Sequence, residues 1–175
     1  LHGSIHSFPT RRSSDLLAFI ALIALVNAPL TWLGDVTGIA QAIGKPTNLS
    51  TILGYLLAPI AWVIGTPWGD ATTVGSLIGQ KVVINEFVAY TELSQIVNGQ
   101  VPGAMLSKEG ALIATYALCG FANFSSIAIQ IGGIGGLAPE RRGDLAKFGL
   151  RAVLGGSIAT FMTATIAGVL SSFGG

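Results

Sequence analysis

The sequence predicts an all-α integral membrane protein in which transmembrane helices are combined with a re-entrant helical hairpin and a discontinuous helix. Composition supports this fold class, because 51% of the residues are hydrophobic and only 10% are charged, and the mean hydropathy is +0.69. Ordinary soluble domains carry about 25% charged residues. Uncharged stretches of nearly bilayer-spanning length also recur along the chain. We therefore expect the protein to lie in a lipid bilayer.

Composition and charge argue against several classes of function. A net charge of +1, with no basic run interleaved with aromatic residues, gives no signal for a nucleic-acid partner. The single cysteine, Cys119, has no intrachain disulfide partner, and both histidines lie within the first six residues, far from it in sequence. The sequence therefore predicts no zinc site, no disulfide framework and no cofactor.

The first 16 residues differ abruptly from those that follow. Residues 1–16 are polar and contain arginine, whereas a strongly apolar stretch begins at Leu17. Residues 6–16 read HSFPTRRSSDL and resemble the in-frame translation of a sequencing-library adapter, so residues 1–16 are interpreted as non-native. A cytoplasmic tail and the start of a signal peptide are the alternatives, and the missing methionine and cleavage site argue against the second. On the first interpretation, the natural N-terminus is expected upstream.

Four segments are expected to form the membrane elements. Residues 17–33 carry no charge and predict a transmembrane helix about 25 Å long. The turn signal GTPWG divides residues 49–97 and suggests a re-entrant hairpin. Residues 110–131 are apolar but interrupted by Gly120 and polar residues, which favours a discontinuous helix. Residues 145–170 contain many small residues and predict a final helix that packs closely.

Basic residues predict the orientation of the chain in the membrane. Arg141, Arg142, Lys147 and Arg151 cluster around the last loop, whereas residues 97–106 carry no basic side chain. Cytoplasmic loops carry an excess of Lys and Arg. The loop around Arg141 and Arg142 is therefore expected in the cytoplasm and the C-terminus outside.

Glu86 is the first candidate site residue, because it is ionisable and lies among apolar residues. A charged side chain at the bilayer centre costs about 2.5 kcal/mol or more, so such residues usually line a water-filled pocket or a substrate path. There Glu86 would accept hydrogen bonds from a polar ligand such as a sugar, with Asn85 positioning backbone or ligand. The alternative is an internal ion pair with Lys81 or another cation, or a place near the membrane interface.

The segment GFANFSS at residues 120–126 provides a second group of candidates. Asn123 and Ser126 are three residues apart and would share one helical face. Gly120 allows the backbone to depart from helical geometry, which at membrane depth occurs where the backbone lines a cavity or is buried in protein. Close helix packing, with Asn123 as an interhelical hydrogen-bonding group, is the alternative.

Residues 79–90, GQKVVINEFVAY, resemble the signature G-x-K-x-x-x-N-E-F-V-A of concentrative nucleoside transporters. The resemblance continues through YALCGFANFSSIAIQIGG and LAPERRGDLAKFGLRA and covers essentially everything after residue 16. It implies the C-terminal part of such a transporter, one half of an inverted repeat, with residues 17–33 as a scaffold helix at a trimer interface. The hairpin, the broken helix and the final helix are expected to follow in that order.

The resemblance also implies roles for particular residues. Glu86, Asn123 and Ser126 match the family's ribose contacts, Phe121 matches an aromatic residue near the base, and Asn85 adjoins the glutamate. The ligands of the coupling ion, Na⁺ or H⁺, are expected upstream of this chain. The implied function is concentrative nucleoside uptake by cation symport, carried out by a homotrimer in the lipid bilayer of a bacterial inner membrane, with alternating access and no nucleic-acid partner.

Two other classes of function remain to be compared with symport. A membrane channel, or a non-transporting gate-domain receptor for nucleoside-like ligands, is compatible with the same helices. A membrane enzyme would need a nucleophile, a general base and an orienting residue together, or a cluster of metal ligands, and the sequence shows neither pattern. We therefore predict that the protein is not an enzyme.

Overall fold

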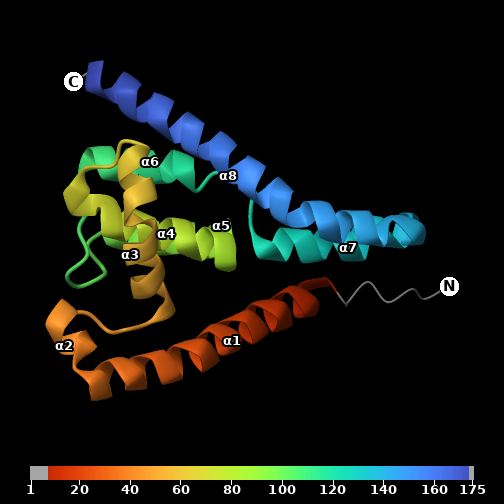
Figure 1. The fold of residues 1–175 in the computed structure, drawn as a ribbon, viewed down its shortest axis with the longest axis horizontal. Coiled ribbons are helices and arrows are strands. Elements are labelled where there is room, and N and C mark those ends of the chain that lie inside the picture. The colour runs from red at the N-terminus through yellow and green to blue at the C-terminus, as the bar shows by residue number, and fades with distance from the viewer. Residues whose placement is uncertain (1–7, 174–175) are drawn as a thin grey trace. The chain divides into compact units, whose positions relative to one another are not determined.

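A computed structural model describes residues 8–173, and within them every regular element is a helix (Figure 1). The predicted all-α class is thus confirmed for the described part of the chain. The chain divides into two compact units, Leu1–Thr51 and Ile52–Gly175. The described elements are α1 (Phe8–Thr37), α2 (Ile39–Ile43), α3 (Leu49–Val63), α4 (Trp68–Val83), α5 (Glu86–Val97), α6 (Lys108–Ala117), α7 (Phe124–Leu137), the 3₁₀ helix η2 (Pro139–Arg141) and α8 (Arg142–Phe173).

The first unit contains α1, α2 and the first turn of α3. Helix α1 covers the whole of residues 17–33 and also residues 8–16, which the sequence suggested to be non-native. The side-chain oxygen of Asn27 in α1 accepts a hydrogen bond of 2.9 Å from the backbone N–H of Leu49, the first residue of α3. This bond satisfies one of the N–H groups that a helix start leaves without an intrahelical partner. Asn27 therefore supplies a side-chain acceptor to the first N–H group of α3.

The second unit begins within α3, and its first helices are separated by two sharp breaks. Helices α3 and α4 are bent by 117° at the GTPWG turn. A further break at residues 84–85 separates α4 from α5, which pack against each other. The region predicted as one hairpin, residues 49–97, thus contains three helices. The sequence did not predict the break at residues 84–85, which lies directly before Glu86.

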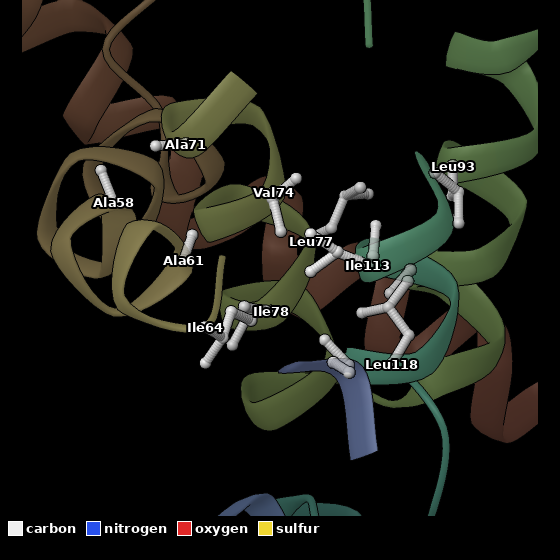
Figure 2. Packing of buried hydrophobic residues seen from close by; sticks show 14 of the residues in the cluster. Ala58, Ala61, Ile64, Ala71, Val74, Leu77, Ile78, Leu93, Ile113 and Leu118 are labelled. Atoms are coloured by element: carbon white, nitrogen blue, oxygen red, sulfur yellow. The ribbon is translucent and has the colours of Figure 1, made fainter. Parts of the chain in front are cut away.

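Close backbone contact joins α3 to α4. A Cβ atom added to Gly75 would lie 2.7 Å from the carbonyl oxygen of Gly54, a distance that leaves room for glycine alone. Such small residues let helices approach closely, as expected in membrane proteins. Figure 2 shows the core that results, with α4 side chains lying between those of α3 and α6. The buried residues labelled there are Ala58, Ala61, Ile64, Ala71, Val74, Leu77, Ile78, Leu93, Ile113 and Leu118.

Helix α8 lies along both α6 and α7 and bridges the gap between them (Figure 1). Gly149 lies against Ile127 in α7, whereas Gly168, further along α8, lies against Ile113 in α6. The helix is therefore antiparallel to the discontinuous helix and spans its break. It is longer than the predicted residues 145–170 and exposes an apolar face at every fourth position, at Leu150, Leu154, Ile158, Met162, Ile166 and Leu170.

Length and apolar character mark candidate membrane spans among the described residues. One helix, Pro139–Phe173, is long and apolar enough to cross a bilayer. The bent pair Leu49–Val63 and Trp68–Val83 passes the same test when its two helices are taken together, as in a broken span or a re-entrant loop. Phe124–Gly133 is a shorter apolar segment. The continuous helix covers the predicted residues 145–170 and the bent pair lies within the predicted hairpin, residues 49–97, whereas residues 17–33 are not among these candidate spans.

Candidate functional site

Two breaks in helical structure meet at the candidate site. The first lies between α4 and α5, where Ile84 has φ −104° and ψ −89°. The second lies between Ala117 and Phe124 and contains Gly120 at φ +89°, a conformation that side-chain-bearing residues rarely adopt. The Ser125 hydroxyl lies 3.0 Å from the Ile84 carbonyl oxygen and so joins the two breaks. Segments about forty residues apart in sequence thus form one polar centre.

Each break ends at an asparagine that caps the helix after it. Asn85 has extended backbone, and its side-chain oxygen accepts a hydrogen bond of 3.0 Å from the Val88 N–H. The side-chain oxygen of Asn123 accepts one of 2.8 Å from the Ser126 N–H. Both bonds have the position that an N-cap residue takes. The positive ends of the α5 and α7 dipoles therefore both lie at the site.

A direct hydrogen bond connects the two predicted site residues Glu86 and Asn123. The Asn123 amide Nδ2 donates to Glu86 Oε2 over 2.8 Å. Asn123 is only 1% exposed, and Glu86 is half-buried in the first turn of α5. A carboxylate is stabilised in the first turn of a helix and by a donated hydrogen bond. These two effects offset part of the cost of placing a charge in apolar surroundings.

The alternative ion pair between Glu86 and Lys81 is not what the structure shows. The Lys81 ammonium is fully buried and donates to the Ala117 carbonyl oxygen and to Thr160 Oγ1, each over 3.2 Å. The salt bridge found within the described part of the chain joins Arg141 Nε to Asp144 Oδ2, over 2.6 Å. Glu86 is thus left with a neutral hydrogen-bond partner, Asn123, and its side chain is half-buried.

Donors are crowded around the Asn123 side-chain oxygen. The Ser126 N–H, the Ser126 hydroxyl and the Ser125 hydroxyl each lie 2.8 Å from it. A carbonyl oxygen has two lone pairs. One of the two hydroxyls can therefore turn toward a ligand at little cost. Ser125 has the Ile84 carbonyl oxygen as a second acceptor, and Ser126 lines a cavity.

Phe121 and Asn85, the other two predicted residues, differ in accessibility. Phe121 lies in the second break, is 75% exposed and lines, together with Ser126, a cavity of about 250 Å³ between this break, α7 and α8. The Asn85 side-chain oxygen caps α5 directly before Glu86, and a contact of Asn85 with a ligand stays a prediction. Ser125 is the residue that sequence reasoning missed, although it adjoins Ser126 in the NFSS motif.

The site is polar but resembles no metal centre. Within residues 8–173, no three His, Cys, Asp or Glu side chains gather in a way that would hold a metal ion. A second cavity, of about 380 Å³, lies further along the α7–α8 interface beside Arg141 and Asp144. The hydrogen-bonding groups of the site are one carboxylate, one amide and two hydroxyls, a set that suits a neutral, hydroxyl-rich ligand.

Comparison with known proteins links this geometry to a class of transporters. Residues 13–168 match the family model described as the C-terminus of Na⁺-dependent nucleoside transporters. The chain is 50% identical over 154 residues to the uncharacterized transporter YutK of Bacillus subtilis (strain 168), covering 88% of this chain and 35% of YutK. It is 41% identical over 167 residues to sodium/nucleoside cotransporter 1 of Rattus norvegicus, covering 90% of this chain and 25% of that protein.

A solved structure shares the fold. The structure of CNTnw in an inward-facing substrate-bound state matches with a TM-score of 0.75 and 46% sequence identity, covering 93% of this chain and 36% of that one. The chain therefore spans between a quarter and slightly more than a third of the length of these relatives. The unwound segments and the long α8 thus occur within a fold that a solved transporter structure also contains.

Proposed function

We propose, because this chain belongs to the Na⁺-dependent nucleoside transporter family and matches its C-terminal part, that the whole protein takes up nucleosides together with a cation, Na⁺ or H⁺. The chain has the all-helical fold of these membrane transporters, and its relatives are transporters and not enzymes. The observation that carries the proposal is the hydrogen bond between Asn123 and Glu86 across two helix breaks. Half-helix ends facing each other near mid-membrane are typical of transporter substrate sites.

The chemistry of this site suits the ribose of a nucleoside. The Glu86 carboxylate accepts hydrogen bonds from two vicinal hydroxyls, while Asn123 Nδ2 and the Ser126 hydroxyl supply donors to the ribose oxygens. Phe121, exposed beside the cavity, offers an apolar ring face to the base. Binding forms and breaks no covalent bond, so the nucleoside is released unchanged.

The coupling ion is proposed to bind outside this chain. The family model describes Na⁺ dependence, and the rat relative is a sodium/nucleoside cotransporter. We propose that the ion ligands, together with further base-recognising residues, lie in the part of the protein upstream of this chain. Transport then proceeds by alternating access, in which one central site opens in turn to each side of the membrane.

Assembly and orientation follow from the same proposal. We place the protein in the inner membrane of a bacterium as a homotrimer, with residues 17–33 as a scaffold helix at the trimer interface. The loop that holds Arg141 and Arg142 is placed in the cytoplasm and the C-terminus outside, in accord with the positive-inside rule. The exposed apolar face of α8 suits contact with lipid or with another membrane helix.

Uptake measurements test the proposal. A full-length protein that carries this chain as its C-terminal part is expressed in cells, and uptake of radiolabelled uridine and adenosine is followed in Na⁺, in choline and at several pH values. We expect saturable accumulation against a gradient, driven by Na⁺ or H⁺. Glu86→Gln should abolish it because the carboxylate acceptor is lost, whereas Glu92→Gln, further along α5, should leave it intact.

The same measurement distinguishes symport from a channel or a receptor. A channel would equilibrate nucleoside without accumulating it, and a receptor would bind nucleoside without moving it. Absence of accumulation in every ion condition, from a protein shown to reach the membrane, would therefore contradict symport.

A further inference from the structure

Helix α4 contacts both ends of α6 through charged side chains. Asp70, in the first turn of α4, accepts hydrogen bonds at Oδ2 from the backbone N–H and the hydroxyl of Ser107, over 3.1 and 2.5 Å. Ser107 is the N-cap of α6. At the other end, the Lys81 ammonium donates to the carbonyl oxygen of Ala117, the last residue of α6, over 3.2 Å. A carboxylate thus lies at the start of α6 and an ammonium at its end.

The spacing and the sign of these charges both fit α6. Asp70 and Lys81 are separated by about 16 Å of helical rise along α4, and Ser107 and Ala117 by about 15 Å along α6. Negative charge is favourable at a helix N-terminus and positive charge at a C-terminus. We call this pair of contacts the α4 clamp. It holds α6 against α4 at both ends of α6.

Lys81 is the buried half of the clamp. It is fully buried, and its ammonium also contacts Thr160 Oγ1 in α8 over 3.2 Å. The Thr160 hydroxyl donates its own proton to the Ser157 carbonyl oxygen, which leaves a lone pair for Lys81. Two of the three ammonium donors thus have acceptors, which offsets part of the cost of burying the charge. One side chain therefore joins α4, α6 and α8.

Lys81 lies close to both helix breaks, to one in sequence and to the other through its hydrogen bond to Ala117. It precedes the break at residues 84–85 by about one turn, and its acceptor on Ala117 is the last helical carbonyl before the segment that leads to Asn123. Glu86 follows the first break and Asn123 ends the second, and these two residues are hydrogen-bonded to each other. A shift of Ala117 would consequently be transmitted to Asn123 through only six residues of chain.

We propose that Lys81 is a positioning residue for the nucleoside site. By holding the end of α6, it sets the break that places Asn123 against Glu86, although it contacts no ligand itself. The proposal rests on the proposed function, because the pair that it positions is the one assigned to the ribose. Loss of Lys81 should therefore weaken recognition of the ribose hydroxyls in particular.

Uptake of two substrates tests this role. Lys81→Met keeps the length of the side chain and removes its charge and donors. In the full-length protein, we expect the KM for uridine to rise about 10-fold or more, as misplacing a binding group does, while the KM for 2′,3′-dideoxyuridine changes much less. A general loss of folded protein would lower the maximal rate for both substrates and leave their KM ratio unchanged.

Asp70→Asn is the matched control, because it weakens the clamp at the far end of α6, away from the breaks. Its KM ratio for the two substrates should equal that of the wild type. If Lys81→Met does not reach the membrane, Thr160→Val removes one of the two ammonium partners, and we expect a rise of about 3-fold in the KM for uridine alone.

The possible outcomes separate this proposal from the proposed function. An unchanged KM for uridine, or equal rises in KM for both substrates, would overturn the role of Lys81 while wild-type uptake kept the transport function intact. A wild-type protein without nucleoside uptake would overturn the transport function, and the role of Lys81 with it.

Discussion

The Asn123 amide donates a hydrogen bond of 2.8 Å to the Glu86 carboxylate, although the two residues lie on different helices and are 37 residues apart. Each also belongs to a helix start, since Asn123 caps α7 and Glu86 begins α5. Their relative position is therefore set by two helix ends and not by flexible loops. A site held in this way is largely formed before a ligand arrives.

Replacing the amide of Asn123 by a carboxylate should be more damaging than removing it. Asn123→Asp places a second carboxylate next to Glu86, where like charges repel and the donor of the native bond is lost. We expect nucleoside uptake by Asn123→Asp to fall below that by Asn123→Ala, each normalised to the amount of protein in the membrane. Equal uptake by the two variants would show that Asn123 and Glu86 are not in contact during transport.

Ser125 should matter although it was not predicted as a site residue. Its hydroxyl lies between the Ile84 carbonyl oxygen and the Asn123 side-chain oxygen, and it shares one proton between the two acceptors. Ser125→Ala should raise the KM for uridine about 3- to 10-fold, since a hydrogen bond is worth about 0.5–1.5 kcal/mol. Ser172→Ala, at an exposed position near the end of α8, is the control and should leave the KM unchanged.

Alanine at Gly120 should destabilise the fold. Gly120 has φ +89°, and an added Cβ atom would lie 3.4 Å from Thr160 Cγ2. We expect Gly120→Ala to lower the free energy of unfolding by about 1–2 kcal/mol, because a side chain is strained in this conformation. Thermal unfolding in detergent measures the effect. Gly132→Ala, in the open interior of α7, should leave the unfolding midpoint unchanged or raise it.

A larger residue at the α3–α4 crossing should also be destabilising. A Cβ atom at Gly75 would lie 2.7 Å from the Gly54 carbonyl oxygen and 2.9 Å from the Ala58 nitrogen. Gly75→Ala should therefore cost about 1–3 kcal/mol of stability, as overpacking does. Gly69→Ala, on the same helix with no neighbour within 4 Å, is the matched control. Similar midpoints for the two variants would contradict the close crossing.

The sequence was most informative where polar residues interrupt apolar stretches. Glu86 and Asn123 were identified because ionisable and amide groups are costly in lipid, and Ser126 because it would share a helical face with Asn123. The structure brings all three together in one hydrogen-bonded group. Gly120 indicated a discontinuous helix, and it lies at a positive φ inside the break. Their roles in ribose binding remain a prediction.

Other features were not evident from the sequence. The break at residues 84–85 follows an apolar run, and only the order Asn85 then Glu86, a cap followed by an acidic first turn, could have indicated it. The contacts of Ser125 and of Lys81 join residues more than thirty positions apart. Spacing along a single helix carries no information about such contacts, which arise only when helices pack.

Because helix α8 packs against both α6 and α7, it constrains the number of residues in the break at residues 118–123. Gly149 packs against Ile127 in α7 and Gly168 packs against Ile113 in α6. Both halves of the discontinuous helix thus contact the same helix, α8, at defined positions. If the six residues of the break could not absorb an inserted or deleted residue, the side chains of α7 would shift by one position against α8, which is about 100° around the helix axis. Loops usually tolerate insertions and deletions. The break at residues 118–123 should instead tolerate substitutions but not changes in length in proteins that keep the function.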